Sequence, residues 1–153
     1  MQAPLKTRIL DAPRKFLRIL KTEMEKGKDH PGKMAASIAL GLFFGIVPIW
    51  GFQMLAAFTT ASLLKLNRVV VLLATNISFP IFIPFVVFIS YEFGSLFVSD
   101  PVQLPAFEDI DQEMIYLQIN QYLIGSVILA IVVAFIGFSL TFILMKKKVN
   151  KGN

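Results

Sequence analysis

The chain of 153 residues contains no cysteine, which excludes disulfides, thiolate nucleophiles and thiol-ligated metal sites. It also contains little charge: Asp, Glu, Lys and Arg make up 16% of the residues, against about 25% in an average soluble domain. Histidine occurs once, at position 30, in a linker where we expect it to be solvated. Hydrophobic residues make up 56% of the chain. This composition is typical of a membrane protein.

Basic residues are absent from the middle of the chain, since no Lys or Arg occurs between Val69 and Met145. Nine of the fifteen lie in residues 1–33, two separate the long apolar runs, and four follow Met145. Acidic residues concentrate at 99–118 instead. Such segregation indicates membrane topology, with the basic segments on the cytoplasmic side, and argues against a nucleic-acid partner. The basic N-terminus has no apolar core, so we do not expect it to be a signal peptide.

Residues 1–32 are predicted to form a cytoplasmic basic helix and a linker. Asp11 is a suitable N-cap and Gly27 a suitable stop, which predicts a helix over roughly 12–26. Its apolar and basic residues fall on opposite faces. They are Phe16, Leu17, Leu20 and Met24 on one face, and Arg14, Lys15, Arg18 and Lys21 on the other. This pattern is typical of an interfacial helix on anionic lipid, and the alternative is a cytoplasmic helix packed on the membrane domain.

The uncharged run 34–64 is broken at its centre by Pro48 and Gly51. As one helix it would be about 46 Å long, half again the hydrocarbon thickness of about 30 Å. A helical hairpin that folds back at the break puts Lys33, Lys65 and every other basic segment on the cytoplasmic side, so we expect that arrangement. Its short legs would either re-enter without crossing or span a thinned, protein-lined region. Small residues at helical spacing predict that the two legs pack closely against one another. They are Ala35, Ala36, Ala39, Gly41 and Gly45 on the first leg, and Ala56, Ala57, Thr60 and Ala61 on the second.

The second long apolar run, 69–98, is interrupted by two prolines four residues apart, Pro80 and Pro84. Proline removes a backbone donor and disfavours helix at the preceding residue. We therefore expect the run to cross the membrane outward with a break shortly before the first proline. Asn76 and Ser78 can hydrogen-bond the carbonyl groups that the break frees.

Residues 99–118 are predicted to form an outer loop with solvated carboxylates, and a calcium site is remote because no glycine-turned ligand loop is present. The run 121–145 is predicted to be an ordinary spanning helix, followed by a cytoplasmic lysine-rich tail at 146–153. The predicted fold is all-α and polytopic. It comprises the amphipathic N-terminal helix and a membrane domain at 33–153 with a broken hairpin, a broken crossing and a final transmembrane helix. We expect both termini to be cytoplasmic and the thin bundle to form a homo-oligomer, most simply a twofold dimer.

The two interrupted runs are the candidates for a binding site, because broken helices expose backbone dipoles that hold charged headgroups or ions. The alternative is that both breaks are only structural. The hypothesised substrate-binding residues beside the breaks are Pro48, Trp50, Gly51, Gln53, Asn76, Ser78 and Pro80. Arg68 is either a phosphate partner from the cytoplasmic side or a topology anchor. Glu92 is either a functional carboxylate inside the membrane or an interfacial one.

The sequence shows no paired inward carboxylates, no Ser/His/Asp set, no phosphate loop and no metal cluster. A hydrolase inside the membrane would need a nucleophile and a base that face each other. We therefore expect no enzymatic activity, no cofactor and no metal.

An ordered set of Gly, Pro and Asn positions resembles a family of small bacterial membrane proteins. The matching residues are Ala39-Leu-Gly41-x-x-x-Gly45-x-x-Pro48-x-x-Gly51-x-Gln53, then Leu66-Asn67-Arg68, Asn76-x-x-x-Pro80 and Tyr91-x-x-Gly94. The family is catalogued as a domain of unknown function (DUF2062), and the resemblance covers about residues 15–145. It implies a protein of the bacterial inner membrane. Relatives joined to glycosyltransferase domains imply a link to lipid-linked sugars or envelope chemistry, but no catalytic residue can be carried over.

These features lead us to expect transport or flipping of an amphiphile, such as a polyprenyl phosphate or a lipid-linked sugar. The site would be formed by residues 48–53 facing residues 76–80. The partners would be membrane lipids, including those with anionic headgroups. The alternative is a non-transporting adaptor or scaffold that holds an envelope glycosyltransferase at the membrane, for which the basic N-terminal helix would matter more than the breaks.

Overall fold

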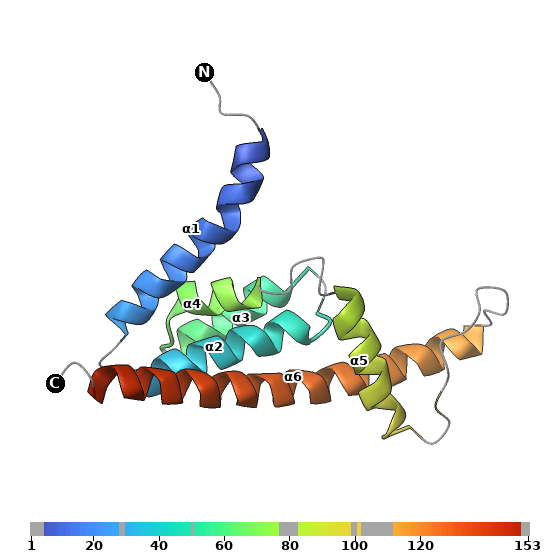
Figure 1. Ribbon diagram of the computed structural model, residues 1–153. Coiled ribbons are helices and arrows are strands. Elements are labelled where there is room, and N and C mark those ends of the chain that lie inside the picture. The colour runs from blue at the N-terminus through green and yellow to red at the C-terminus, as the bar shows by residue number, and fades with distance from the viewer. Residues whose placement is uncertain are drawn as a thin grey trace.

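The computed structural model describes residues 5–27, 30–49, 51–76, 83–98, 101 and 112–150. These residues form six helices and no strand, so the fold is all-α as predicted. The helices are α1 (Leu5–Lys26), α2 (Pro31–Ile46), α3 (Gln53–Leu63), α4 (Arg68–Thr75), α5 (Ile83–Ser95) and α6 (Gln112–Asn150). The 39 residues of α6 extend over about 58 Å, and α2 and α5 pack along different parts of its length (Figure 1).

Helix α1 begins at Leu5, so the predicted start after Asp11 was wrong. The capping signal is local, and residues 5–10 are mostly good helix formers that continue the helix ahead of it. The predicted C-terminal end of α1 is confirmed, since the helix ends at Lys26. The Gly27 N–H makes the last hydrogen bond, to the Glu23 carbonyl at 3.1 Å. The second half of α1 packs apolar side chains against the other helices. Leu20 and Met24 pack against a buried cluster of Met34, Val70 and Met145.

Helices α2 and α3 reverse the chain direction around the Pro48–Gly51 break. Helix α2 ends two residues before Pro48 and α3 begins two residues after Gly51, whose φ of +83° is a left-handed conformation that favours glycine. The far end of α3 returns to the start of α2, because the Asn67 N–H that follows it donates to Ser37 Oγ at 3.0 Å. Ser37 lies one turn after Lys33, to whose carbonyl it donates at 2.8 Å. The two ends of the run 34–64 are therefore adjacent.

Helix α4 runs parallel to α2 and packs against it through Gly41. A Cβ at this position would collide with the Ala74 side chain and lie 2.5 Å from the Val71 carbonyl oxygen, so only glycine permits the contact. The prediction that Gly41 joins the two hairpin legs was therefore wrong, since its partner is α4. On the second leg, Ala57 and Ala61 are fully buried and pack with Val71 of α4. Leu40 and Phe44 of the first leg pack against the same cluster, so the predicted contact between the legs is present but shared with α4.

Helix α5 crosses the N-terminal half of α6, beyond the region covered by α2 (Figure 1). The backbones approach closely, because a Cβ at Gly125 would collide with the Ser90 carbonyl oxygen. Across the same contact, the Gln121 side-chain amide donates to the Tyr91 carbonyl at 3.2 Å. Helices α4 and α5 are thus separate elements with different partners. Helix α4 ends at Thr75, next to the predicted break, and α5 begins at Ile83, while residues 77–82 lie outside the described residues.

Helix α6 extends beyond both ends of the predicted span 121–145. It begins inside the predicted outer loop and continues through the lysine-rich tail, because lysine ends an apolar run without ending a helix. Within the described ranges, Gln118–Lys147 is the segment long and apolar enough to cross a membrane. Helix α2 and the Phe85–Ser95 segment are apolar but shorter. Most of the predicted outer loop, residues 99–100 and 102–111, lies outside the described residues.

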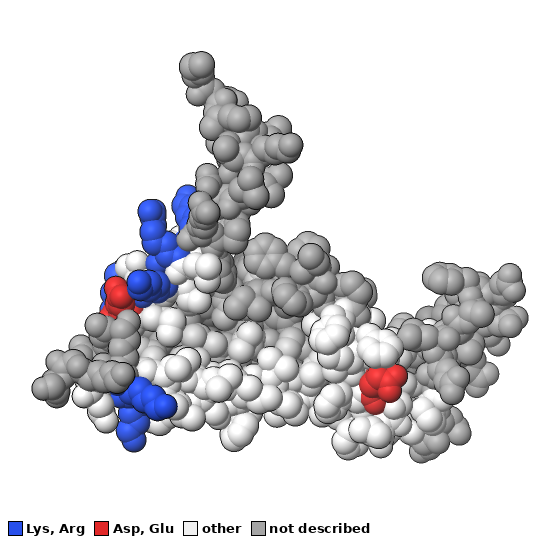
Figure 2. All heavy atoms as spheres, viewed as in Figure 1, with Lys and Arg blue, Asp and Glu red and all other residues white. Residues whose placement is uncertain are grey.

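Large apolar side chains cover much of the outer surface. Phe135 and Leu144 on α6 are 72% and 63% exposed, and Leu55 on α3 is 62% exposed. Apolar surface of this extent marks a face that contacts a membrane or a partner. On the face drawn in Figure 2, basic side chains gather at the end of the molecule where α6 finishes and α1 joins, while the middle is free of charge among the residues drawn in colour.

Candidate functional site

The break in the hairpin lies about halfway along the apolar segment of α6. Helix α2 is antiparallel to α6, and a Cβ at Gly137 would collide with the Leu42 side chain. Gly137 is ten residues, or about 15 Å, from Lys147 at the end of the candidate span. Pro48 lies six residues further along the chain than Leu42, which adds about 9 Å. The break is thus about 24 Å into a segment of 30 residues, or about 45 Å.

The C-terminal ends of α2 and α4, which precede the two interrupted regions, lie on the same side of the molecule. Helices α2 and α4 are parallel, and the N-terminal residues of α4 lie beside Ser37 while its last turn lies beside Gly41. Both helices therefore run in the same direction, and their C-terminal ends, Ile46 and Thr75, lie on one side of the helical unit. Residues 77–82, which follow α4, lie outside the described residues.

The residues of the hairpin turn are only partly enclosed. Pro48 and Gln53 are half-buried, and Gly51 is exposed. Gln53 begins α3, whose first turn receives no side-chain cap, although the Gln53 N–H itself donates to the Ile49 carbonyl at 3.0 Å. Trp50 lies outside the described residues.

Asn76 is exposed and closes the C-terminal end of α4. Its side-chain amide donates to the Leu72 carbonyl at 2.9 Å. This carbonyl also accepts the Asn76 backbone N–H at 3.2 Å, so it is not one of the carbonyl groups that the prolines were predicted to free. Ser78 and Pro80 lie outside the described residues. Within the part of the chain that the structure describes, neither Asn76 nor Gln53 makes a side-chain hydrogen bond across the breaks, so both amides retain polar groups for a ligand.

Arg68 and Glu92 are not brought to the breaks. Arg68 begins α4, seven residues or about 10 Å from the end where the break lies, and its guanidinium group stands 5.5 Å from the Phe58 ring centroid. This location favours the anchor interpretation over a phosphate partner at the breaks. Glu92 is exposed on α5 and its carbonyl accepts a hydrogen bond from Ser95 Oγ at 2.7 Å. Its carboxylate is not enclosed by the described helices.

One polar cluster was missed in the sequence, and it joins α1, α2 and α4. The Asn67 side-chain amide donates to Glu23 Oε2 at 2.9 Å, while its backbone N–H donates to Ser37 Oγ at 3.0 Å. Glu23 also forms an ion pair with Lys26 at 2.7 Å. The amide and the ammonium group stabilise the charged carboxylate, so they hold the pKa of Glu23 below its ordinary value of 4.5.

Asn67 is also the N-cap of α4. Its side-chain oxygen accepts hydrogen bonds from the N–H groups of Val69 and Val70 at 3.1 and 3.2 Å. Asparagine directly before an apolar run is a recognisable N-cap signal, so this role could have been predicted. The contact with Glu23 could not, because the two residues are 44 positions apart.

The signature positions have identifiable roles in the structure: Gly41 lies at the α2–α4 contact, Asn67 caps α4, and Tyr91 and Gly94 lie at the crossing of α5 and α6. A family model described as an uncharacterized protein conserved in bacteria, DUF2062, matches residues 14–152. The chain belongs to this family. Comparison with curated proteins and with solved structures gave no match. Membership agrees with the resemblance in the sequence.

Proposed function

We propose that this DUF2062 protein is a multi-pass protein of the bacterial inner membrane that moves an amphiphile between leaflets. The amphiphile would be a polyprenyl phosphate or a lipid-linked sugar. The observation that carries the proposal is that α2 and α4, packed in parallel through Gly41, both end on the same side, α2 about halfway along the apolar segment of α6. Interrupted helices near the bilayer midplane are where transporters bind polar parts of their substrates.

The helix lengths support a hairpin that enters from the cytoplasmic side and returns. Helix α2 has 16 residues and spans about 24 Å, and α3 has 11 residues and spans about 16 Å, so both are shorter than the hydrocarbon core of about 30 Å. The basic residues at 33, 65, 68 and 146–147 all belong to the end of the molecule opposite the break. This arrangement fits cytoplasmic termini under the positive-inside rule.

A break at that depth requires water or protein around it. Backbone groups left unpaired in hydrocarbon cost several kcal/mol each, so irregular chain inside a membrane either packs on protein or lines a wet cavity. The amides of Gln53 and Asn76 at the breaks provide polar groups for a headgroup that crosses the middle of the membrane. The apolar surface of α3 and α6 provides the lipid-facing side along which the chains of the amphiphile would slide.

Transport is tested with the full chain in proteoliposomes that contain a fluorescent polyprenyl phosphate, with dithionite used to quench the outer leaflet. Gln53→Ala and Asn76→Ala should each slow the loss of protected fluorescence about tenfold, since a hydrogen bond to a charged group contributes about 1.5 kcal/mol. Ser62→Ala is the matched control. Like the Asn76 side chain, the Ser62 hydroxyl donates to the carbonyl four residues earlier in its own helix, that of Phe58 at 2.8 Å, but it lies far from the breaks. Unchanged transport in both break variants would contradict the proposal.

The adaptor alternative is favoured by one feature of α1. The first half of this helix projects away from the other five, and Lys15, Arg18 and Lys21 are exposed (Figures 1 and 2). Such a helix could present a charged surface to an envelope glycosyltransferase or to anionic lipid. Co-purification of a glycosyltransferase that is lost on deleting residues 1–27, with transport absent from the intact chain, would favour the adaptor over the transporter.

A further inference from the structure

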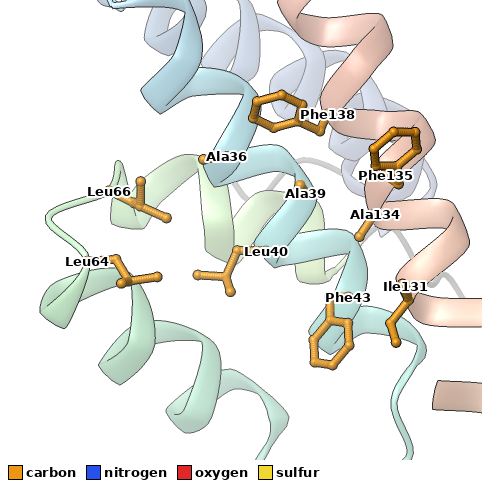
Figure 3. A pocket seen from close by; sticks show the side chains of 10 residues that line it. All are labelled: Ala36, Ala39, Leu40, Phe43, Leu64, Leu66, Ile131, Ala134, Phe135 and Phe138. Atoms are coloured by element: carbon orange, nitrogen blue, oxygen red, sulfur yellow. The ribbon is translucent and has the colours of Figure 1, made fainter. Parts of the chain in front are cut away.

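A groove runs along the side of the molecule between α2, α6 and the connection from α3 to α4 (Figure 3). Its volume is about 430 Å³, which falls within the usual range of ligand sites. All ten side chains that line it are apolar. Small residues on the two helices, Ala39 and Ala134, leave the space, and Phe43, Phe135 and Phe138 stand beside them. The groove is thus suited to an apolar chain, and its lining side chains provide no hydrogen-bonding group for a polar one.

One end of this groove carries lysines from α2 and from the α3–α4 connection. Lys33 lies one turn before the lining residue Ala36, on the same side of α2. Lys65 stands between two lining residues, Leu64 and Leu66. Both lysines are exposed.

A third lysine reaches the same end along α6. Phe138, which lines the groove, stacks on Phe142 with ring centroids 6.0 Å apart, and Lys146 Nζ stands 5.9 Å from the Phe142 ring centroid. Glu23, the α1 carboxylate that contacts Asn67, is already paired with Lys26. Among the described side chains, Lys33, Lys65 and Lys146 form no ion pair, so this end of the groove carries positive charge.

The backbone of Lys65 is a second, independent observation. Its φ of +53° lies in the left-handed region, where glycine is favoured and a side chain is strained. A glycine would make the turn after α3 more easily. The residue that occupies this position is a lysine, whose exposed charge lies between the groove residues Leu64 and Leu66.

We propose that the groove binds the apolar chain of an anionic amphiphile whose headgroup is held by Lys33, Lys65 and Lys146. An apolar trough and a cationic end together match such a molecule, whereas a zwitterionic lipid gains little from the lysines. The site rests on the membrane placement proposed above, but not on transport through the breaks. It lies on the cytoplasmic half of α6, where a substrate would be loaded before it reaches them.

The test uses the full chain in phosphatidylcholine nanodiscs and farnesyl phosphate that carries a terminal diazirine, with labelled peptides mapped after irradiation. Label should appear within 36–43 and 131–138. Each of Lys65→Gly and Lys146→Gln should weaken labelling about fivefold, which corresponds to the loss of one cation near an anionic headgroup. Lys147→Gln is the matched control, since it points from the opposite side of α6 and should change little. Lys65→Gly should leave the melting temperature unchanged or higher, so weaker labelling could not be ascribed to unfolding.

A second pair of variants tests the trough itself. Ala134→Phe fills the space and should abolish labelling, while Val132→Phe, on a neighbouring exposed position outside the groove, should not. Equal labelling by the same chain bearing phosphocholine, full labelling of Ala134→Phe, or cross-links from these positions to a second copy of the chain would each overturn the proposal. Gln53→Ala and Asn76→Ala should label normally, so binding here and transport through the breaks can fail separately.

Discussion

Asn67 connects three helices with one side chain and one backbone N–H. It caps α4, bonds the Glu23 carboxylate of α1 and donates to Ser37 of α2. Its hydrogen bond to Glu23 holds α1 against the four-residue connection between α3 and α4. These contacts lie at the end of the molecule where the basic residues gather. Its two functions, cap and tether, use different atoms and can be separated by mutation.

We predict that Asn67→Ala destabilises the protein by about 2 kcal/mol, because it removes an N-cap and a hydrogen bond to a charged group. Asn67→Asp should keep the cap but set a carboxylate against Glu23, so that α1 is released while the rest remains folded. Circular dichroism in detergent would measure the first effect, and protease cleavage within α1 the second. Ser62→Ala, with a solvent-facing bond inside one helix, should show neither.

The tether should also respond to acid. The pKa of Glu23 is lowered in the folded protein, chiefly by the Asn67 amide and then by Lys26. A lowered pKa stabilises docking at pH values above the ordinary 4.5, and this contribution is lost as the pH falls through the lowered value. A spin label at Leu17→Cys, an exposed position, should therefore become more mobile below about pH 4.5. In Glu23→Gln the mobility should not vary with pH, and a transition of the same size there would refute this origin.

Most helices could be located from the sequence, but the helices that pack against one another could not. The hairpin break and the interruption before the prolines follow from backbone chemistry at glycine and proline, which is local and readable. The start of α1 was missed because good helix formers ahead of Asp11 override a local cap signal. The partner of Gly41 was missed because a small-residue stripe indicates close packing without indicating which helix packs there.

Gly41 therefore gives the sharpest prediction for helix packing. Gly41→Ala should destabilise the fold by about 1–3 kcal/mol, since the added methyl meets the Val71 carbonyl, which is backbone and cannot rotate away. Gly32→Ala in the first turn of the same helix is the control. Nothing lies within 4 Å of its Cβ, and the substitution should be neutral or stabilising. Equal melting temperatures for the two variants would show that α2 and α4 do not meet at Gly41.

For the whole molecule, the sequence predicted the charge pattern that the structure gathers at one end. The binding groove escaped prediction, because it forms from residues near 39, 65 and 134 that only the tertiary arrangement brings together. Of the hypothesised site residues, Pro48, Gly51, Gln53 and Asn76 lie beside the ends of α2, α3 and α4, whereas Arg68 and Glu92 were included for their chemistry and lie elsewhere. Polar residues are easily identified in a largely apolar membrane sequence. The residues that line the groove are apolar like their neighbours, so no sequence pattern distinguishes them.

The account depends on the chain doubling back at residues 48–51, so that both ends of the run 34–64 face the cytoplasm. The native chain has no cysteine, which allows single cysteines at positions 33, 65 and 101 to be labelled with a membrane-impermeant thiol reagent in right-side-out and inside-out vesicles. Positions 33 and 65 should react only in inside-out vesicles, and position 101 only in right-side-out ones. Reaction of positions 33 and 65 from opposite sides would show that the chain crosses the membrane between them instead of doubling back.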